Sequence, residues 1–160
     1  MDNRIIKELN VYSSYLQYRQ AVLNYTSEDR GLTLNRDDQV YVAVFDIPLE
    51  SGIVGYQTQT LALIFGLNAH IYHGSGECTV GLEKYPNVMR AMQSLLISSG
   101  QILPMMNPVS KLDFYNSKYV RAYLRAPRGL YFKELTGQTK EDKFLLMLLD
   151  NVLREIGRAK

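Results

Sequence analysis

Four residues in the first half of this 160-residue chain carry side chains suited to acid–base or nucleophilic chemistry. His73, Glu77 and Cys78 lie close together around a glycine-rich stretch at residues 74–76, and Asp46 stands near the end of an earlier apolar run. A cysteine nucleophile needs a neighbouring base that favours its thiolate, and His73 could supply that base. The grouping therefore predicts, as one alternative, a small enzyme that uses the His73/Cys78 loop.

The same stretch also has simpler interpretations. Cys78 is the only cysteine, and an unpaired cysteine is commonly a small buried hydrophobe. On a strand, His70 and His73 point to opposite faces, so they cannot share one metal ion without a bend. The glycine loop lacks the lysine and Ser/Thr pair of a phosphate-binding P-loop. We expect no metal site and no cofactor, and the sequence leaves open whether Cys78 is reactive and what a substrate would be.

A second group alternates aromatic and basic side chains in the C-terminal third of the chain. If residues 118–126 form a strand, most of these side chains share one exposed sheet face, which the next strand extends. The group is Tyr119, Arg121, Tyr123, Arg125, Tyr131 and Lys133. Tyrosines on such a face stack on bases and arginines contact phosphates, which predicts single-stranded nucleic-acid binding as another alternative. The same composition is also typical of protein interfaces.

The conformation and the charge of this region leave its use open. Residues 118–126 could form a helix that brings Val120, Tyr123 and Leu124 together, but the cleaner alternation favours a strand. Residues 111–133 contain six lysines and arginines and one aspartate, a net charge of +5 in a chain whose total is +2. Such local basic charge marks either an anionic partner or a solvated strand face.

Composition limits the class of protein. A hydrophobic fraction of 46% and a charged fraction of 21% indicate one globular domain over residues 1–160. A single cysteine cannot form an internal disulfide, and charged residues occupy the N-terminus where a signal peptide would be apolar. The longest apolar runs fall far short of the ~20 residues of a membrane span. We expect a cytoplasmic protein that does not enter a membrane.

Three helices are expected from apolar residues at three- and four-residue steps. The first covers residues 5–25, with a broad buried face. The second begins at Pro86, which suits a first helical turn, and ends at Gly100. The third follows Thr139, an N-cap residue with acids in the next turn, and has the clearest stripe. That stripe is Leu145, Leu148, Leu149, Val152, Leu153 and Ile156.

Strands are expected between these helices. Residues 40–47 are apolar on both alternating faces, which predicts a central strand covered on both sides. Residues 58–73 form a hairpin around residues 66–68. Turn sequences divide residues 111–135 into a three-strand meander, and Pro104 and Pro108 argue against regular structure at residues 101–110. The result is an α+β fold with a mostly antiparallel sheet of about five to six strands, in the order helix, strand, hairpin, helix, meander, helix.

The function that these features favour is a non-catalytic protein-interaction domain. The expected helix at residues 5–25 carries four tyrosines, Tyr12, Tyr15, Tyr18 and Tyr25, which is more aromatic surface than one covering helix needs. We therefore predict a protein partner, most simply a second copy in a homo-oligomer. Nucleic-acid binding and the small enzyme remain as alternatives.

Overall fold

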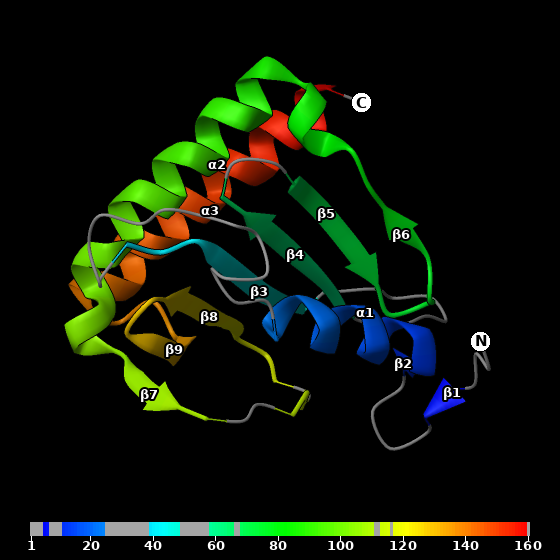
Figure 1. Cartoon of the computed structure of the whole chain (residues 1–160), viewed down its shortest axis with the longest axis horizontal. Coiled ribbons are helices and arrows are strands. Elements are labelled where there is room, and N and C mark those ends of the chain that lie inside the picture. The colour runs from blue at the N-terminus through cyan, green and yellow to red at the C-terminus, as the bar shows by residue number, and fades with distance from the viewer. Residues whose placement is uncertain are drawn as a thin grey trace.

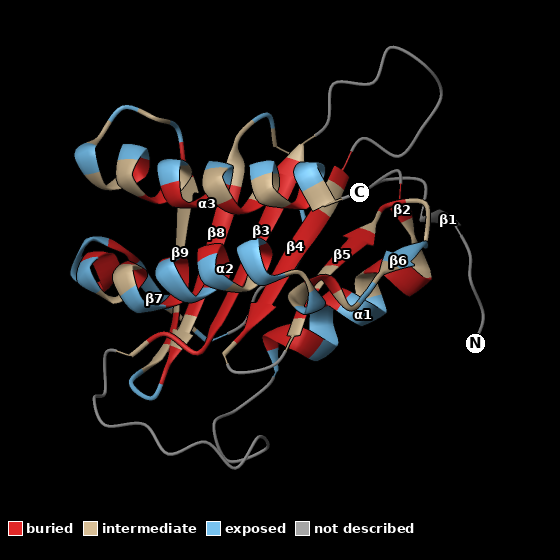
Figure 2. Ribbon diagram, turned by 90° about the horizontal axis from the view of Figure 1, so that it is seen from above, coloured by how far each residue is buried: buried red, intermediate tan, exposed pale blue. Residues whose placement is uncertain are grey.

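The computed structural model describes residues 5–6, 11–24, 39–48, 58–65, 68–110, 113–115 and 117–159. A seven-stranded sheet separates one helix, α1, from two others, α2 and α3, which pack side by side on the opposite face (Figure 1). Figure 2 shows that burial concentrates along the central strands, whereas the outward faces of α2 and α3 are exposed. None of the described helices has the length and hydrophobicity of a membrane span.

The elements follow one another in this order: β1 (Ile5–Ile6), β2 (Val11–Tyr12), α1 (Ser13–Leu23), β3 (Val42–Pro48), β4 (Thr58–Ile64), β5 (Asn68–His73), β6 (Cys78–Thr79), η1 (Leu82–Lys84), α2 (Pro86–Ser99), η2 (Gly100–Met105), β7 (Asn107–Val109), β8 (Val120–Ala126), β9 (Gly129–Leu135) and α3 (Lys140–Ala159). Strands β1 and β2 form a separate pair. The large sheet has the order β6-β5-β4-β3-β8-β9-β7, and every pairing in it is antiparallel.

The predicted α+β class is confirmed, with three α-helices and an antiparallel sheet in the described part of the chain. The strand count is higher than predicted because β6 and β7 have only two and three residues, too few to produce a visible alternation. β7 contains Pro108, which was expected to prevent regular structure. β7 lies at the edge of the sheet, where a proline that cannot donate a ladder hydrogen bond is tolerated.

Two other boundaries differ from the prediction. The first helix starts at Ser13 instead of residue 5, because residues 5–6 and 11–12 pair as β1 and β2. Of the three strands expected in residues 111–135, the first is not formed at residues 113–115, which are irregular. The strand that joins β8 and β9 as the third member is β7, which pairs with β9. The strand over most of residues 118–126 is confirmed as β8. Tyr25 lies outside the described residues.

Both faces of the sheet are buried, as predicted for the central strand β3. Because side chains alternate along a strand, Phe45 and Leu61 pack toward α2 and α3, whereas Val44 and Ala62 pack toward α1. The face toward α2 and α3 has the larger apolar cluster. The face toward α1 includes polar and charged side chains, and these include several of the predicted site residues.

The start of α3 is tied to β9 through one carboxylate. Asp142 accepts hydrogen bonds from Lys133 Nζ (2.6 Å), from the backbone N–H and hydroxyl of Thr136 and from the N–H of Gly137. Thr139 Oγ1 in turn accepts from the Asp142 N–H, which confirms the predicted N-cap. Gly137 has φ +84°, a conformation that favours glycine. This network fixes α3 against the sheet.

Candidate functional site

The histidine and cysteine predicted to act together lie on opposite faces of the sheet. Cys78 is the cross-strand partner of Tyr72, so these two side chains share a face. His73, the next residue along β5, points to the other face. Its Nε2 lies 3.1 Å from Thr79 Oγ1, and Thr79 follows Cys78 in β6. The loop therefore does not place His73 as a base for Cys78.

Asp46 and Glu77 do not complete the predicted cluster. Asp46 lies in the same cross-strand row as Cys78, but Tyr72 and Thr60 stand between them. At ~4.8 Å per strand, three strand spacings separate their backbones by about 14 Å. Glu77 is exposed in the turn before β6. The four candidate catalytic residues are thus not brought into one pocket.

The Cys78 thiol is exposed, yet partial burial raises its pKa above the ordinary value. Because only the thiolate reacts, Cys78 is expected to be alkylated by iodoacetamide at neutral pH more slowly than a free thiol such as N-acetylcysteine. The rate should rise steadily as the pH is increased. Alkylation faster than the free thiol at neutral pH would contradict this and revive the enzyme alternative.

Asp46 belongs instead to a buried ion pair beneath α1. Arg19 Nε lies 3.0 Å from both carboxylate oxygens and Arg19 Nη2 lies 2.8 Å from Oδ2, with the two side chains 2% and 0% exposed. The Thr60 hydroxyl donates to Asp46 Oδ1 at 2.7 Å. Since that hydroxyl has one proton, Tyr15 donates to Thr60 in the Tyr15–Thr60 hydrogen bond. The carboxylate is therefore held by α1 and β4 together.

Two guanidinium groups alternate with aromatic rings around this pair. Arg19 lies 5.0 Å from the ring centroid of Tyr123 and 5.5 Å from that of Phe114. Arg121 lies 5.5 Å from Phe114 and 5.1 Å from Tyr115. Arg121 also donates from Nη1 to the Tyr115 carbonyl, while its buried Nε has no hydrogen-bond partner among the described residues. Cation–π contacts thus stabilise two buried cations.

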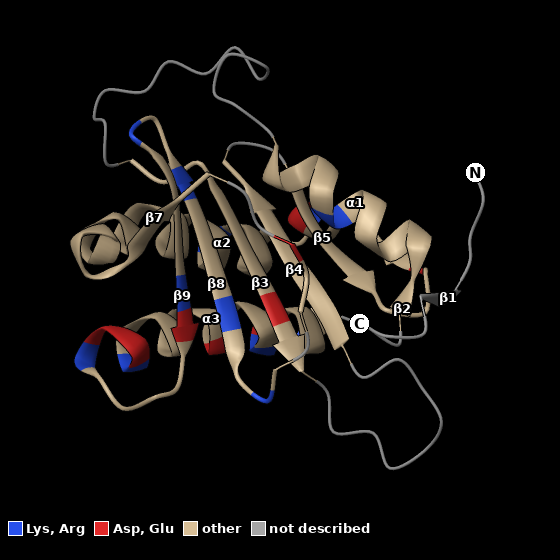
Figure 3. Ribbon diagram, turned by 90° about the horizontal axis from the view of Figure 1, so that it is seen from below, with Lys and Arg blue, Asp and Glu red and all other residues tan. Residues whose placement is uncertain are grey.

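The electrostatics of this cluster raise the pKa values of its two tyrosines and of Arg19. Burial, and next the nearby Asp46 carboxylate, raise the pKa of Tyr15 and of Tyr123. Burial alone would lower the pKa of Arg19, but the charge and hydrogen bonds of Asp46 outweigh it and raise that pKa. Figure 3 shows basic and acidic segments on neighbouring strands of the face that carries α1. Such an arrangement holds α1 in place, and it keeps the Tyr15 and Tyr123 hydroxyls protonated near neutral pH.

The predicted Tyr/Arg face exists only in part, and it is not exposed. Arg121, Tyr123 and Arg125 share one face of β8, but Arg121 is 1% and Tyr123 0% exposed. Arg125 donates from Nε and Nη2 to the Leu23 carbonyl at the end of α1. Tyr119 precedes β8. The prediction of an exposed face is wrong because α1 and residues 113–115 cover it.

Tyr131 and Lys133 do not extend that face. Their partners in β8 are Leu124 and Ala122, whose side chains point toward α2 and α3. Tyr131 packs against the apolar cluster on that side, and Lys133 pairs with Asp142. The predicted extension is wrong because β8 and β9 pair in a register that places these two residues opposite the even-numbered residues of β8.

A partly exposed aromatic surface lies where the sheet ends at β6. The Tyr18 ring stacks on Tyr72 with centroids 5.5 Å apart, and the His70 ring stacks on Tyr72 at 6.1 Å. Cys78 is exposed beside Tyr72, and Val80, just after β6, is 61% exposed. We call these five residues the β6 edge surface. They combine aromatic and aliphatic area with the backbone of an edge strand.

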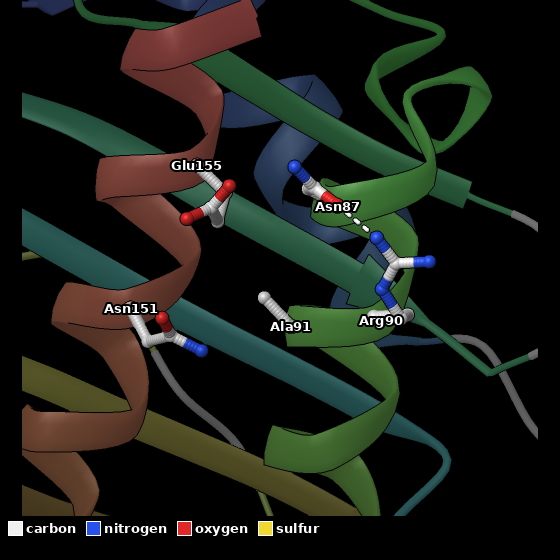
Figure 4. A pocket seen from close by; sticks show the side chains of 5 residues that line it. All are labelled: Asn87, Arg90, Ala91, Asn151 and Glu155. Atoms are coloured by element: carbon white, nitrogen blue, oxygen red, sulfur yellow. Dashed lines mark hydrogen bonds between the residues drawn. The ribbon is translucent and has the colours of Figure 1, made fainter.

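A polar pocket of about 310 Å³ opens between α2 and α3 (Figure 4). It is lined by Asn87, Arg90, Ala91, Asn151 and Glu155. The first three come from the first half of α2 and the other two from the second half of α3, so the two helices run in opposite directions past it. The sequence contains no signal of this pocket, because polar residues one turn apart on each of two helices do not indicate that the helices face each other.

Neither a metal site nor a similarity to known proteins identifies a function for these residues. Among the described residues, no group of three or more His, Cys, Asp or Glu side chains is placed to hold a metal ion. No protein-family model, curated protein or solved structure matches this chain.

Proposed function

We propose that this chain is a non-catalytic, cytoplasmic interaction domain that associates with a second copy of itself through the β6 edge surface. The observation that carries the proposal is the row of stacked rings, Tyr18, Tyr72 and His70, beside the last strand on this side of the described sheet. An edge strand presents backbone donors and acceptors that a second strand can pair with. Two copies of β6 running antiparallel satisfy each other about a two-fold axis.

The side chains support the same contact. Tyrosine is enriched at protein interfaces because it combines a rigid apolar ring with a polar tip. Tyr18 and Val80 expose apolar area at this edge. The other large exposed apolar side chains whose surroundings are described include Ile97 on α2, Met105 on η2 and Met147 on α3. Each of these three residues lies on a different helix, and single exposed apolar residues of this kind need no partner.

The expected association is weak. β6 has two residues, and short edge strands limit how many backbone hydrogen bonds a second copy can make. The rings and Val80 must supply the remaining contact area, which points to an interface below about 1,200 Å². We therefore expect a dimer that forms at high protein concentration and dissociates on dilution. The single cysteine is compatible with the reducing compartment proposed here.

The test is sedimentation velocity over a wide concentration range in the presence of reductant, which prevents disulfide formation through Cys78. The unmodified chain should shift from monomer to dimer as concentration rises. Val80→Glu places two like charges near the two-fold axis and should weaken dimerisation at least about tenfold. The matched control is Ile97→Glu, which introduces the same charge at a residue that is 70% exposed on α2 and should leave dimerisation unchanged.

Two results would overturn the proposal. The unmodified chain could remain monomeric at every concentration, or the Val80→Glu and Ile97→Glu variants could weaken association equally. The second result would mean that association depends on net charge and not on the β6 edge surface.

A further inference from the structure

Independently of self-association, we infer that the pocket between α2 and α3 binds a small zwitterion, a molecule that carries an ammonium and a carboxylate a few atoms apart, as a free amino acid does. The volume of about 310 Å³ is at the lower end of the range of ligand pockets. The two helices contribute groups of opposite charge to facing walls, as the side chains in Figure 4 show. The ligand class follows from these two walls.

The wall on α3 presents an unsatisfied carboxylate oxygen. Glu155 Oε1 accepts from Arg158 Nη1 at 2.7 Å. Glu155 Oε2 is buried and has no hydrogen-bond partner among the described residues, and the side chain is 13% exposed. A buried acceptor without a donor costs free energy that a ligand can recover. An ammonium group has three donors, and it also matches the charge.

The wall on α2 presents an exposed guanidinium with free donors. Arg90 Nη2 donates to Asn87 Oδ1, one turn earlier on the helix. No other hydrogen bond of Arg90 is found in the described part of the chain, so most of its five donors are available. Its planar fork suits a carboxylate. Asn87 lies in the first turn of α2, where the helix dipole also favours negative charge.

The remaining residues leave room between these walls. Ala91 is a small buried residue of α2 that lines the pocket next to Arg90, and Asn151 adds an amide group from α3. A lone cation would leave Arg90 unmatched, and a lone anion would leave Glu155 unmatched. A zwitterion meets both, with its ammonium at Glu155 and its carboxylate at Arg90.

The direct test titrates the full chain with glycine and follows backbone amide NMR shifts on α2 and α3. Because the pocket is open and small, we expect saturable binding with a Kd in the millimolar range. Acetate and methylammonium, each carrying one of the two charges, should bind at least about tenfold more weakly. Glu155→Gln and Arg90→Gln should each weaken glycine binding by a similar factor, and Ala91→Leu should abolish it by filling the space.

Arg154→Gln is the matched control, since it removes an exposed charge from α3 outside the pocket and should leave glycine binding unchanged. The competing arrangement is a direct ion pair in which Arg90 turns onto Glu155. In that case the Arg90→Gln and Glu155→Gln changes would be coupled in unfolding experiments without glycine, and glycine would not bind. Absence of saturable glycine shifts, or undiminished binding by Ala91→Leu, overturns the inference.

Discussion

Replacing Asp46 with valine is expected to lower the free energy of unfolding by about 3–5 kcal/mol, the usual cost of removing one partner from a buried ion pair. Arg19 would keep its charge, because a guanidinium does not lose its proton in a protein. Its three short contacts with the carboxylate would be lost, and the rings of Phe114 and Tyr123, which carry no net charge, would not replace the counter-charge. Valine suits a strand, so the backbone of β3 should be unaffected. Urea unfolding followed by circular dichroism measures the loss.

A double-mutant cycle separates the pair from its surroundings. Arg19→Met alone leaves the Asp46 carboxylate buried without its guanidinium partner, although Thr60 still donates to it, and it should also cost several kcal/mol. The double variant Arg19→Met with Asp46→Val removes both charges, and its stability should return to within about 2 kcal/mol of the unmodified chain. Single changes that cost less than about 1 kcal/mol would contradict the assignment of Asp46 to a buried, paired state.

Replacing Asp142 with alanine should cost about 2–4 kcal/mol, because a charged acceptor of several hydrogen bonds is lost and Lys133 is left unpaired. The control is Glu141→Ala in the same helical turn. Glu141 contributes through the helix dipole, so its removal should cost under about 1 kcal/mol. Equal losses for the two variants, measured by thermal unfolding, would show that the Asp142 network adds nothing beyond the dipole.

The same residue predicts a pH dependence. Burial alone would raise the pKa of Asp142, but the hydrogen bond and charge of Lys133, together with Thr136 and Thr139, lower it. Its stabilisation is therefore complete above the pKa in the unfolded chain, about 3.9, and is lost as pH falls through the lower pKa of the folded chain. The stability difference between the unmodified chain and Asp142→Asn should be constant at neutral pH and shrink in acid. A difference that grows in acid would have the wrong sign.

Local patterns predicted the elements that carry strong periodicity. The α3 stripe from Leu145 to Ile156 and the apolar run of β3 both reported burial correctly, because long amphipathic or doubly buried segments need no distant information. β6 and β7 were not predicted, because strands of two or three residues are too short to show an alternation of apolar and polar residues. The early start predicted for the first helix failed because pairing of β1 with β2 overrode helical spacing.

The predicted sites failed for a different reason. Alternation in β8 correctly placed Arg121 and Tyr123 on one face, but no local pattern tells whether another segment covers that face. That face is covered by α1, which is distant from β8 in sequence, and by Phe114, which belongs to an irregular segment. A signal did exist in Arg19, a charge four residues after the buried Tyr15 on the inner face of α1. A buried arginine requires a carboxylate partner, and Asp46 on an apolar central strand was the counterpart.

The same limit applies to the loop between His73 and Cys78. The two residues are close in sequence, which suggested cooperation. Their faces depend on the pairing of β5 with β6, in which the His73 N–H donates to the Glu77 carbonyl and three residues form the turn. Gly76, with φ +93°, closes that turn. A turn one residue longer or shorter would have put Cys78 on the other face, so spacing alone could not decide.

The most direct test of self-association through the β6 edge surface is amide hydrogen exchange at β6 as a function of chain concentration. The Thr79 N–H already faces Ile71 in the pairing of β5 with β6. Pairing of β6 with a second copy therefore protects the backbone N–H groups of Cys78 and Val80, which point away from β5, only when the dimer is populated. We predict that their exchange slows as the concentration is raised about a hundredfold, while the amides of Asn107 and Val109 on the opposite edge strand, β7, stay unchanged. Exchange at β6 that is independent of concentration, in a range where the chain is shown to dimerise, would contradict the account.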